Sequence, residues 1–326
     1  MRIDVHAHLF STAYIDQLRR IFGKDSSPAG QDAQRLISWM STDPRMTNVE
    51  GRLQEMEKYG ISMQVLSVPF HGALVQDETA ALDLTQAAND VLVQAAHKYP
   101  NQFRVLLALP LQFPELVVEE LDRFAGEATV VGVALMGSAG GRPLNDPAFM
   151  PVYAELERRD LPFLLHPISP PGLDCMLELN LANVVGFMFE TTLAAARLVF
   201  AGVFERCPAL QMIFPHLGGL APYLMGRLQW GYERFPACNA NLSAPPEVYF
   251  KRFYYDTVCR NVPALRMALS MFGTEHVLFG TDIPFREDID LQLKDLEALN
   301  LSIVERRAID ADNAARLLGI ALAPGK

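Results

Sequence analysis

The sequence predicts an α/β fold, a (β/α)8 barrel of the TIM type, and two observations carry this prediction. Eight short apolar runs rich in β-branched residues alternate with longer patterns typical of helices. Regular alternation of strand and helix implies a parallel sheet, and eight such units are the number that closes a barrel. A doubly wound open sheet is the alternative that the same alternation allows.

The strand-like runs are almost continuously apolar, which is typical of parallel strands buried on both faces. In chain order they are residues 3–6, 62–68, 105–109, 130–136, 162–166, 211–215, 253–256 and 277–279. Helical patterns fall between them at residues 49–59, 79–99, 115–124, 147–159, 263–272 and 290–299. Asp146 before Pro147, and the early Pro263, are favourable helix-start signals.

Three segments are longer than a minimal barrel needs. They are residues 10–48, 167–205 and 231–251, which follow the first, fifth and sixth strands. In a barrel the carboxyl ends of the strands hold the active site, so these insertions are expected to form its walls and lid. No change in composition marks a second domain, and we expect residues 1–326 to form one domain.

The composition limits the classes of function. The 326 residues are 50% hydrophobic and 20% charged, which suits a large core and argues against disorder. Acidic residues outnumber basic ones by 38 to 28, for a net charge of -10. This balance argues against a nucleic-acid partner and an anionic membrane, both of which need basic patches. It leaves an anionic small-molecule substrate open.

Two further patterns favour a cytoplasmic protein. The amino terminus has Asp4, His6 and His8 where a secretion signal needs an apolar core. The four cysteines show no CxxC spacing, which indicates reduced thiols and no cysteine-type zinc site.

The most hydrophobic stretch, residues 181–204, contains three polar side chains. Asn183, Glu190 and Arg197 recur at seven-residue intervals, so they share one stripe of an otherwise buried helix. A membrane span would not hold an acid and a base there without partners. Glu190 and Arg197 could pair within the helix bundle or across a dimer contact.

The strongest chemical signal is the pair His6 and His8, at the end of the first strand. Side chains two residues apart on a strand point to the same side, so both imidazoles can converge on one point. Three more polar groups end other strands: His166 the fifth, His216 the sixth and Asp282 the eighth. Parallel strands deliver all of these ends to one face of the barrel.

Neutral imidazoles and a carboxylate are the ligands that a borderline divalent ion such as zinc prefers. The sequence therefore predicts a metal site held by His6, His8, His166 and Asp282. A lone strand-end histidine is more often a buried structural group, but the joint pattern is far more specific.

Several motifs resemble the amidohydrolase superfamily, and more narrowly its family-2 branch, which contains aminocarboxymuconate-semialdehyde decarboxylase and the salicylate- and resorcylate-type decarboxylases. The resemblance extends from the third residue to about Leu318. The motifs are DVHAH (4–8), LLHP (164–167), FPHLGG (214–219) and FGTD (279–282), with further similar segments at 51–67, 122–136, 187–219 and 310–320.

The resemblance implies a distorted (β/α)8 barrel with one catalytic divalent metal. His6 and His8 match the HxH ligands, His166 the third ligand and Asp282 the fourth. His216 matches a histidine beside the metal that acts on substrate or on water. Zinc is favoured and manganese is the alternative, because some relatives replace the first histidine with glutamate and this chain does not. The branch lacks a metal-bridging lysine, and Met136 and Gly137 stand at the fourth strand end. A homodimer is also implied.

The resemblance favours a lyase: a metal-dependent, non-oxidative decarboxylase of a hydroxylated aromatic or muconate-like carboxylic acid. Asp282 would carry a proton to the ring carbon and His216 would polarise the phenol or relay protons. The same residues could instead serve a hydrolase that opens a lactone or a related carboxylic derivative. A metal-binding barrel without catalysis is a third alternative.

Substrate contacts are expected from side chains near the barrel mouth. An arginine from the first insertion, Arg45 or Arg35, or Arg260 after the seventh strand, could bind a carboxylate. His71 follows the second strand and could reach the substrate. Aromatic candidates for the pocket wall are Phe10, Trp39, Phe70, Phe187 and Phe189.

Overall fold

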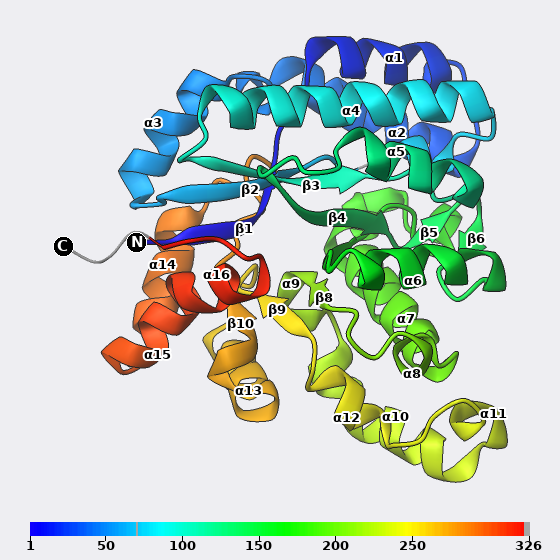
Figure 1. Cartoon of the computed structure of the whole chain (residues 1–326), viewed down its shortest axis with the longest axis vertical. Coiled ribbons are helices and arrows are strands. Elements are labelled where there is room, and N and C mark those ends of the chain that lie inside the picture. Colours follow the sequence, from blue (N-terminus) through cyan, green and yellow to red (C-terminus); the bar gives the residue numbers. More distant parts are fainter. Residues whose placement is uncertain (70, 323–326) are drawn as a thin grey trace.

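The chain forms a parallel eight-stranded sheet surrounded by helices, as predicted (Figure 1). The computed structural model describes residues 1–69 and 71–322, without the side chain of His71. The strand order is β1-β2-β3-β4-β7-β8-β9-β10. Their bounds are Ile3–His8, Met63–Ser67, Phe103–Ala108, Val130–Met136, Phe163–His166, Met212–Phe214, Tyr254–Asp256 and Val277–Leu278.

Hydrogen bonds between β1 and the segment after β10 close the sheet into a barrel. The Val5 amide donates to the Phe279 carbonyl at 3.0 Å, and the His8 amide donates to the Ile283 carbonyl at 2.7 Å. Between them, the Asp282 amide donates to the His6 carbonyl at 2.7 Å. An open doubly wound sheet would leave these edges unpaired, so the barrel prediction is confirmed.

Helices cover the outside of the barrel and begin where the sequence has capping side chains. The side chains of Asn48, Asp77 and Asn261 accept from backbone amides at the starts of three helices. Asp146 caps a 3-10 turn, Pro147–Phe149, which leads into α6. Outside the insertions, the helices between strands are α3 (Val49–Tyr59), α4 (Glu78–Lys98), α5 (Val117–Arg123), α6 (Met150–Arg158) and α13 (Val262–Phe272). The helices α14 (Ile289–Glu297), α15 (Ile303–Arg307) and α16 (Asn313–Leu317) follow the last strand.

The three predicted insertions contain helices of their own. The first holds α1 (Thr12–Phe22) and α2 (Pro28–Thr42), and the second holds α7 (Phe187–Phe200) and α8 (Val203–Arg206). The chain after β8 forms α9 (Pro215–Gly218), α10 (Ala221–Arg234), α11 (Pro236–Asn239) and α12 (Pro246–Phe250). A short antiparallel pair, β5 (Ser138–Ala139) and β6 (Arg142–Pro143), follows β4 and was not expected.

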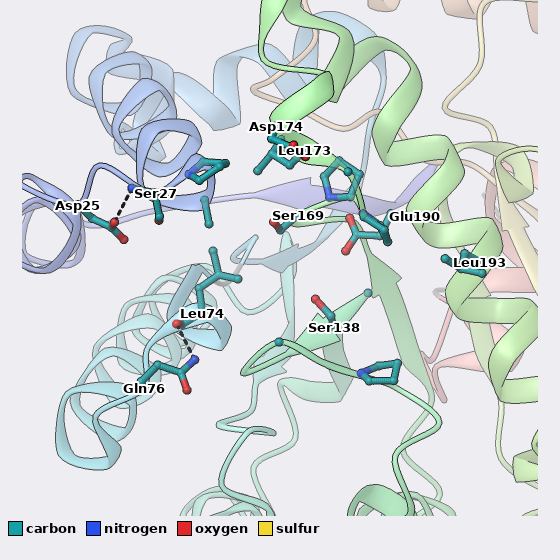
Figure 2. A pocket seen from close by; sticks show the side chains of 18 of the residues that line it. Asp25, Ser27, Leu74, Gln76, Ser138, Ser169, Leu173, Asp174, Glu190 and Leu193 are labelled. Carbon is teal, nitrogen blue, oxygen red and sulfur yellow. Dashed lines mark hydrogen bonds between the residues drawn. The ribbon is translucent and has the colours of Figure 1, made fainter.

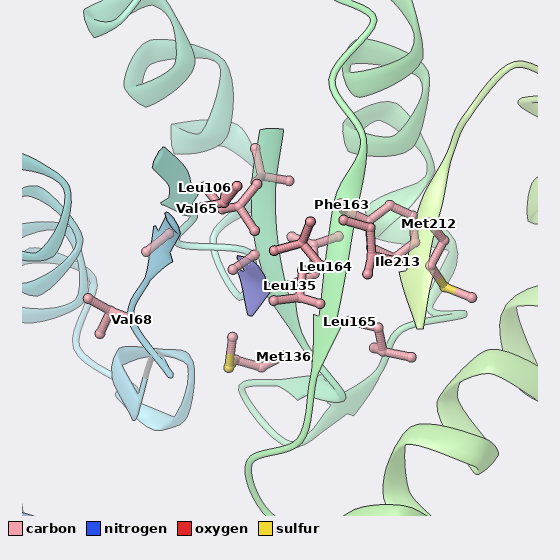
Figure 3. Close-up of a cluster of buried hydrophobic side chains, with 14 of the residues drawn as sticks. Val65, Val68, Leu106, Leu135, Met136, Phe163, Leu164, Leu165, Met212 and Ile213 are labelled. Atoms are coloured by element: carbon pink, nitrogen blue, oxygen red, sulfur yellow. The ribbon is translucent and has the colours of Figure 1, made fainter. Parts of the chain in front are cut away.

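Apolar side chains from successive strands form a rigid scaffold below the strand ends (Figure 3). Val65, Leu106, Leu164 and Ile213 come from four different strands and are fully buried. Close packing of this kind fixes the strands relative to one another, so the side chains at their carboxyl ends are held in place as well.

The apolar stretch around α7 differs from the expected buried helix. Val184 is 64% exposed and Val185 is 51% exposed, whereas Glu190 is only 3% exposed. The prediction of an otherwise buried helix is therefore wrong, because only one side of this segment packs against the barrel. Among the described residues, one helical stretch, Glu178–Phe200, has the length and apolar composition that a membrane span would need. Core helices of soluble proteins pass the same test.

Candidate metal centre

Three imidazoles meet at the carboxyl ends of two strands. His6 and His8 lie on β1 with fully buried side chains, and their ring centroids are 4.9 Å apart. His166 is the last residue of β7, and its ring centroid lies 5.4 Å from that of His6 and 5.0 Å from that of His8. The alternation of side chains along β1 explains why Ala7 points away while both histidines point inward.

Asp282 adds a carboxylate to the three imidazoles. Its backbone has a φ of 64°, in the left-handed region, and its amide is bonded to the β1 carbonyl of His6. Asp282 Oδ1 lies 3.1 Å from His8 Nε2 and 3.5 Å from His6 Nε2. The ligand atoms of His6, His8, His166 and Asp282 all lie within 4.8 Å of one another. The structure thus brings the four predicted metal ligands together.

Unpaired nitrogen atoms show that this group of residues fits a metal ion. Among the described residues, His6 Nε2 and His166 Nε2 are buried and have no hydrogen-bond partner. A buried polar atom without a partner is costly, and a divalent cation would supply the missing interaction. The other ring nitrogens are held by oxygens, which turns each Nε2 toward the shared point. These are Asp256 Oδ2 at 2.6 Å from His6 Nδ1, Ser67 Oγ at 3.0 Å from His8 Nδ1 and the Pro167 carbonyl at 2.7 Å from His166 Nδ1.

The electrostatic environment keeps most of these ligands in the form that binds a cation. Burial lowers the pKa of His8 to about 4 and lowers that of His166 well below its usual value. Burial would raise the pKa of Asp282, but the neighbouring histidines outweigh it and hold that pKa well below its usual range. For His6 burial lowers the pKa, but Asp282 and Asp256 more than compensate and raise it.

His216 stands beside the four ligands. It follows β8 in the short helix α9, with a φ of 52°. Its Nε2 lies 3.7 Å from Asp282 Oδ2, and its ring centroid is 5.4 Å from that of His6. It does not belong to the four-residue ligand group among the described residues. This position lets His216 act on a molecule bound next to the ligands.

A cavity of about 850 Å³ opens above these residues, and His166, His216 and Asp282 line it. Its aromatic wall contains Trp39, Phe187 and Phe285, and three arginines also line it: Arg35, Arg260 and Arg286. The first two insertions supply Arg35, Trp39 and Phe187, as expected for segments after strand ends. The volume suits a small organic substrate.

Other predicted substrate contacts lie elsewhere or outside the described residues. Arg45 is bonded to Asp43 and Glu287 and, like Phe189 and Phe10, is not among the described residues that line the cavity. Phe189 is 39% exposed, whereas Phe10 is buried in the core. Phe70 and the side chain of His71 lie outside the described part of the structure. Between the two arginines considered from the first insertion, the cavity therefore favours Arg35.

Residues that hold the ligands were missed by the sequence reasoning. Asp256 is the last residue of β9 and Ser67 is the last residue of β2. Like His166 and Asp282, both are polar residues at or near the carboxyl end of a barrel strand, and the sequence pattern that predicted those two ligands also includes Asp256 and Ser67. It was not used for these two residues because a single serine or aspartate at a strand end is common.

A buried polar network supports β1 from behind. Arg52, expected to be structural, is 2% exposed and donates to the carbonyls of His8 and Arg45 at 3.1 and 3.2 Å. Gln64 links it to Asp4, whose carboxylate also accepts from the Thr281 hydroxyl at 2.7 Å. Burial raises the pKa of Asp4 to about 6. The network joins the strand that carries two ligands to the segment that carries the fourth.

A single metal site of three imidazoles and one carboxylate, at the carboxyl-end mouth of a closed (β/α)8 barrel, defines a class of metal-dependent barrel enzymes. Within this class the chain belongs to the amidohydrolase family, whose sequence model matches residues 3–320. The two predictions of family and enzyme class are confirmed.

Several of the proteins to which this chain is similar are decarboxylases. The chain is 33% identical to 2-amino-3-carboxymuconate-6-semialdehyde decarboxylase of Dictyostelium discoideum, over 72% of this chain and 66% of that protein. It is 31% identical to γ-resorcylate decarboxylase of a Rhizobium strain, over 86% of this chain and 90% of the other. A dihydroxybenzoic acid decarboxylase structure from a Polaromonas strain, with bound manganese and 2-nitroresorcinol, superimposes with a TM-score of 0.79 at 27% identity, covering 99% and 98% of the two chains.

Proposed function

We propose that this protein is a metal-dependent, non-oxidative decarboxylase of a hydroxylated aromatic or muconate-like carboxylic acid. The observation that carries the proposal is the convergence of His6, His8, His166 and Asp282 on one side of a cavity lined by aromatic and arginine side chains. The similar proteins act on acids of this kind, by their names. We take the hydroxybenzoates as the first substrates to test.

The metal would be held by these four residues and would supply a positive charge that orients and polarises the oxygens of the substrate. Aromatic walls at Trp39, Phe187 and Phe285 favour a flat ring. Enclosure of the ring in this cavity of about 850 Å³ would keep bulk water away from the reacting carbon.

Loss of carbon dioxide requires that a proton replace the carboxylate on the ring carbon. Asp282 and His216 are the candidate carriers, because the 3.7 Å between Asp282 Oδ2 and His216 Nε2 is close to proton-transfer range. The low pKa of Asp282 makes it a carboxylate in the resting enzyme, so it must first take up a proton. We propose that His216 supplies that proton or draws it from the phenol.

The arginines of the cavity already have acidic partners. Arg260 donates to Asp295 at 2.7 Å and to Asp288 at 2.8 Å, and Arg286 donates to Asp288 at 2.7 Å. Arg35 is bonded to Asp32 at 2.8 Å and is half exposed. Arg35 is also bonded to Asn180. We propose Arg35 as the side chain that binds a substrate carboxylate, because its side chain is the most exposed of the three arginines that line the cavity.

We propose zinc or manganese as the metal. The imidazole-rich ligand set favours zinc, and the manganese bound to the Polaromonas enzyme favours manganese. Elemental analysis of protein purified without chelators distinguishes them.

We also propose a homodimer, supported by exposed apolar side chains such as Tyr223 of α10, which is 82% exposed. Light scattering during gel filtration would test it.

The proposed reaction is tested by incubating the metal-loaded protein with a panel of carboxyl-labelled hydroxybenzoates and trapping the labelled carbon dioxide. Release of labelled carbon dioxide with formation of the phenol supports a decarboxylase. Hydrolysis in a parallel lactone panel, with no release of carbon dioxide from any acid, would support the hydrolase instead.

A further inference from the structure

A second cavity of about 820 Å³ lies against the chain segment that follows β7 (Figure 2). Its walls come from the start of α2, the turn after β2, the β5–β6 pair and α7. Ile168 lines the metal cavity and the next residue, Ser169, lines this one. The two cavities are therefore neighbours with different linings.

Glu190 is the most unusual side chain in the second cavity. It is 3% exposed, and its Oε2 accepts a hydrogen bond from the Ile168 amide at 2.8 Å. Its Oε1 is buried and has no partner among the described residues. Figure 2 shows the carboxyl turned toward Ser169 and Ser138. Gly137 gives it room, because a Cβ there would lie 2.6 Å from Oε1. The Ser169 amide also lowers the pKa of this carboxyl, but Oε1 itself lacks a hydrogen bond. A buried carboxyl oxygen of this kind calls for an explanation, and a ligand of the cavity would supply one.

Arg197 lies two helical turns further along α7 and lines the same cavity. The sequence spacing predicts that Arg197 pairs with Glu190 within the bundle or across a dimer contact. No ion pair or side-chain hydrogen bond of Arg197 occurs within the described chain, so pairing within the bundle is not observed. Residues seven apart in a helix are about 10 Å apart along its axis. The two side chains can therefore bind opposite ends of one small molecule.

The charges of the lining indicate what those ends are. Asp25 and Asp174 line the cavity together with Glu190, against the single cation Arg197. A ligand with only an anionic group would meet three carboxyls, and one with only a cationic group would leave the guanidinium unpaired. A ligand with both charges satisfies both ends.

We propose that this cavity is a second ligand site that binds a small zwitterion, with a protonated amine at Glu190 and a carboxylate at Arg197. The amine donates to Glu190 Oε1, the atom that has no partner in the described structure. The site is separate from the metal ligands and uses none of them. The proposal does not depend on which reaction the metal site catalyses.

Isothermal titration of the metal-loaded protein with matched probes, at a pH above the raised pKa of Glu190 so that its carboxyl is ionised, tests this assignment. The probes are 4-aminobutyrate and 6-aminohexanoate, with hexanoate and hexylamine as molecules that have lost one charged end. We expect at least one amino acid to bind, and both single-ended probes to bind at least tenfold more weakly. Arg197→Gln and Glu190→Gln should each weaken the binding of the amino acid at least tenfold.

The control for lost charge is Arg234→Gln, because Arg234 is exposed at the end of α10 and lies outside the cavity lining. It should bind the amino acid as the wild type does. Three results overturn the proposal: no binding of either amino acid by the wild type, equal binding of hexanoate, or equal affinity in the wild type and Arg197→Gln. The last result would place the probe elsewhere, for example on the metal. Arg197 is half-buried, so its variant is expected to fold.

Discussion

At the scale of single residues, two histidines of the site have different positions. His166 is placed to hold a metal, and His216 is placed next to the ligands. His166 Nε2 is buried without a partner and points to the shared centre, whereas His216 lies 3.7 Å from the outer oxygen of Asp282. His166 ends β7 and His216 follows the neighbouring strand β8, yet their positions imply different roles. Substitution can tell these roles apart.

We predict that His216→Ala lowers kcat by roughly 100- to 10,000-fold, the usual contribution of a positioned proton-transfer group, and leaves the bound metal near one per chain. His166→Ala should instead lose most of the metal, because it removes a ligand. Steady-state kinetics and elemental analysis of the two variants provide the measurement. If His216→Ala lost as much metal as His166→Ala, His216 would have to be counted as a ligand.

The carboxylate behind His6 gives a second prediction at this scale. Asp256 Oδ2 lies 2.6 Å from His6 Nδ1, and Asp256 Oδ1 accepts from the amides of Leu217 and Val258. Asp256→Asn should weaken metal affinity by about 10- to 100-fold, because it loosens the orientation of His6. Asp122→Asn is the control, since Asp122 pairs with Arg159 and is 62% exposed. Competition with a fluorescent chelator measures the affinity, and equal values for both variants would refute this role.

At the scale of elements, glycines after strands set how closely the metal-holding strands approach one another. A Cβ on Gly280 would lie 2.9 Å from the Asp256 Cβ and 3.2 Å from the His6 Cβ. We predict that Gly280→Ala lowers the free energy of unfolding by about 1 to 3 kcal/mol and weakens metal binding, because β1 and β9 must separate. Gly226→Ala in α10 meets no atom within 4 Å and should be neutral or slightly stabilising. Denaturant unfolding of both variants measures these free energies. A Gly280→Ala protein as stable as the wild type would contradict the packing argument.

Helix α7 provides a prediction about pH. Burial raises the pKa of Glu190 from 4.5 to about 7, so the folded protein favours the protonated carboxyl. The resulting stabilisation is complete below pH 4.5 and is lost as the pH rises through 7. Glu190→Gln stays neutral, so its unfolding free energy relative to wild type should rise between pH 5 and pH 8, by on the order of 3 kcal/mol. The exposed Glu119→Gln serves as the control. A difference that stays flat with pH for Glu190→Gln would show that the carboxyl is not held protonated.

The elements that could be predicted from the sequence are those fixed by local pattern. Continuous apolar runs located all eight strands of the barrel. Polar residues at the carboxyl ends of these strands located His6, His8, His166 and Asp282. The insertions could be recognised by length, but their conformations could not. The choice between Arg35 and Arg45 depends on how α2 lies against the barrel, and local periodicity does not contain that information. The lack of a hydrogen bond at Glu190 Oε1 likewise results from tertiary packing around α7. The sequence did not show which side of this helix is exposed.

At the scale of the whole molecule, the metal site joins the two ends of the chain. His6 and His8 lie on the first strand and Asp282 follows the last, and the hydrogen bonds that close the barrel run between the same segments. His6 Nε2, on one side of this seam, is buried and lacks a hydrogen-bond partner among the described residues. A bound ion should therefore stabilise the closure of the barrel as well as take part in the reaction.

We predict that removing the metal with a chelator lowers the melting temperature. An ion present at 100 times its dissociation constant stabilises the folded state by about 2.7 kcal/mol. Unfolding entropy is about 2.1 cal/mol/K per residue, so for a chain of 326 residues each kcal/mol corresponds to about 1.5 °C and the loss should be about 4 °C. Differential scanning calorimetry of stripped and manganese-reloaded protein measures it. His166→Ala should show a much smaller difference between the two states, because the loss of one imidazole weakens the site. Identical melting temperatures for stripped and reloaded wild type would mean that the four side chains close the barrel without help from an ion.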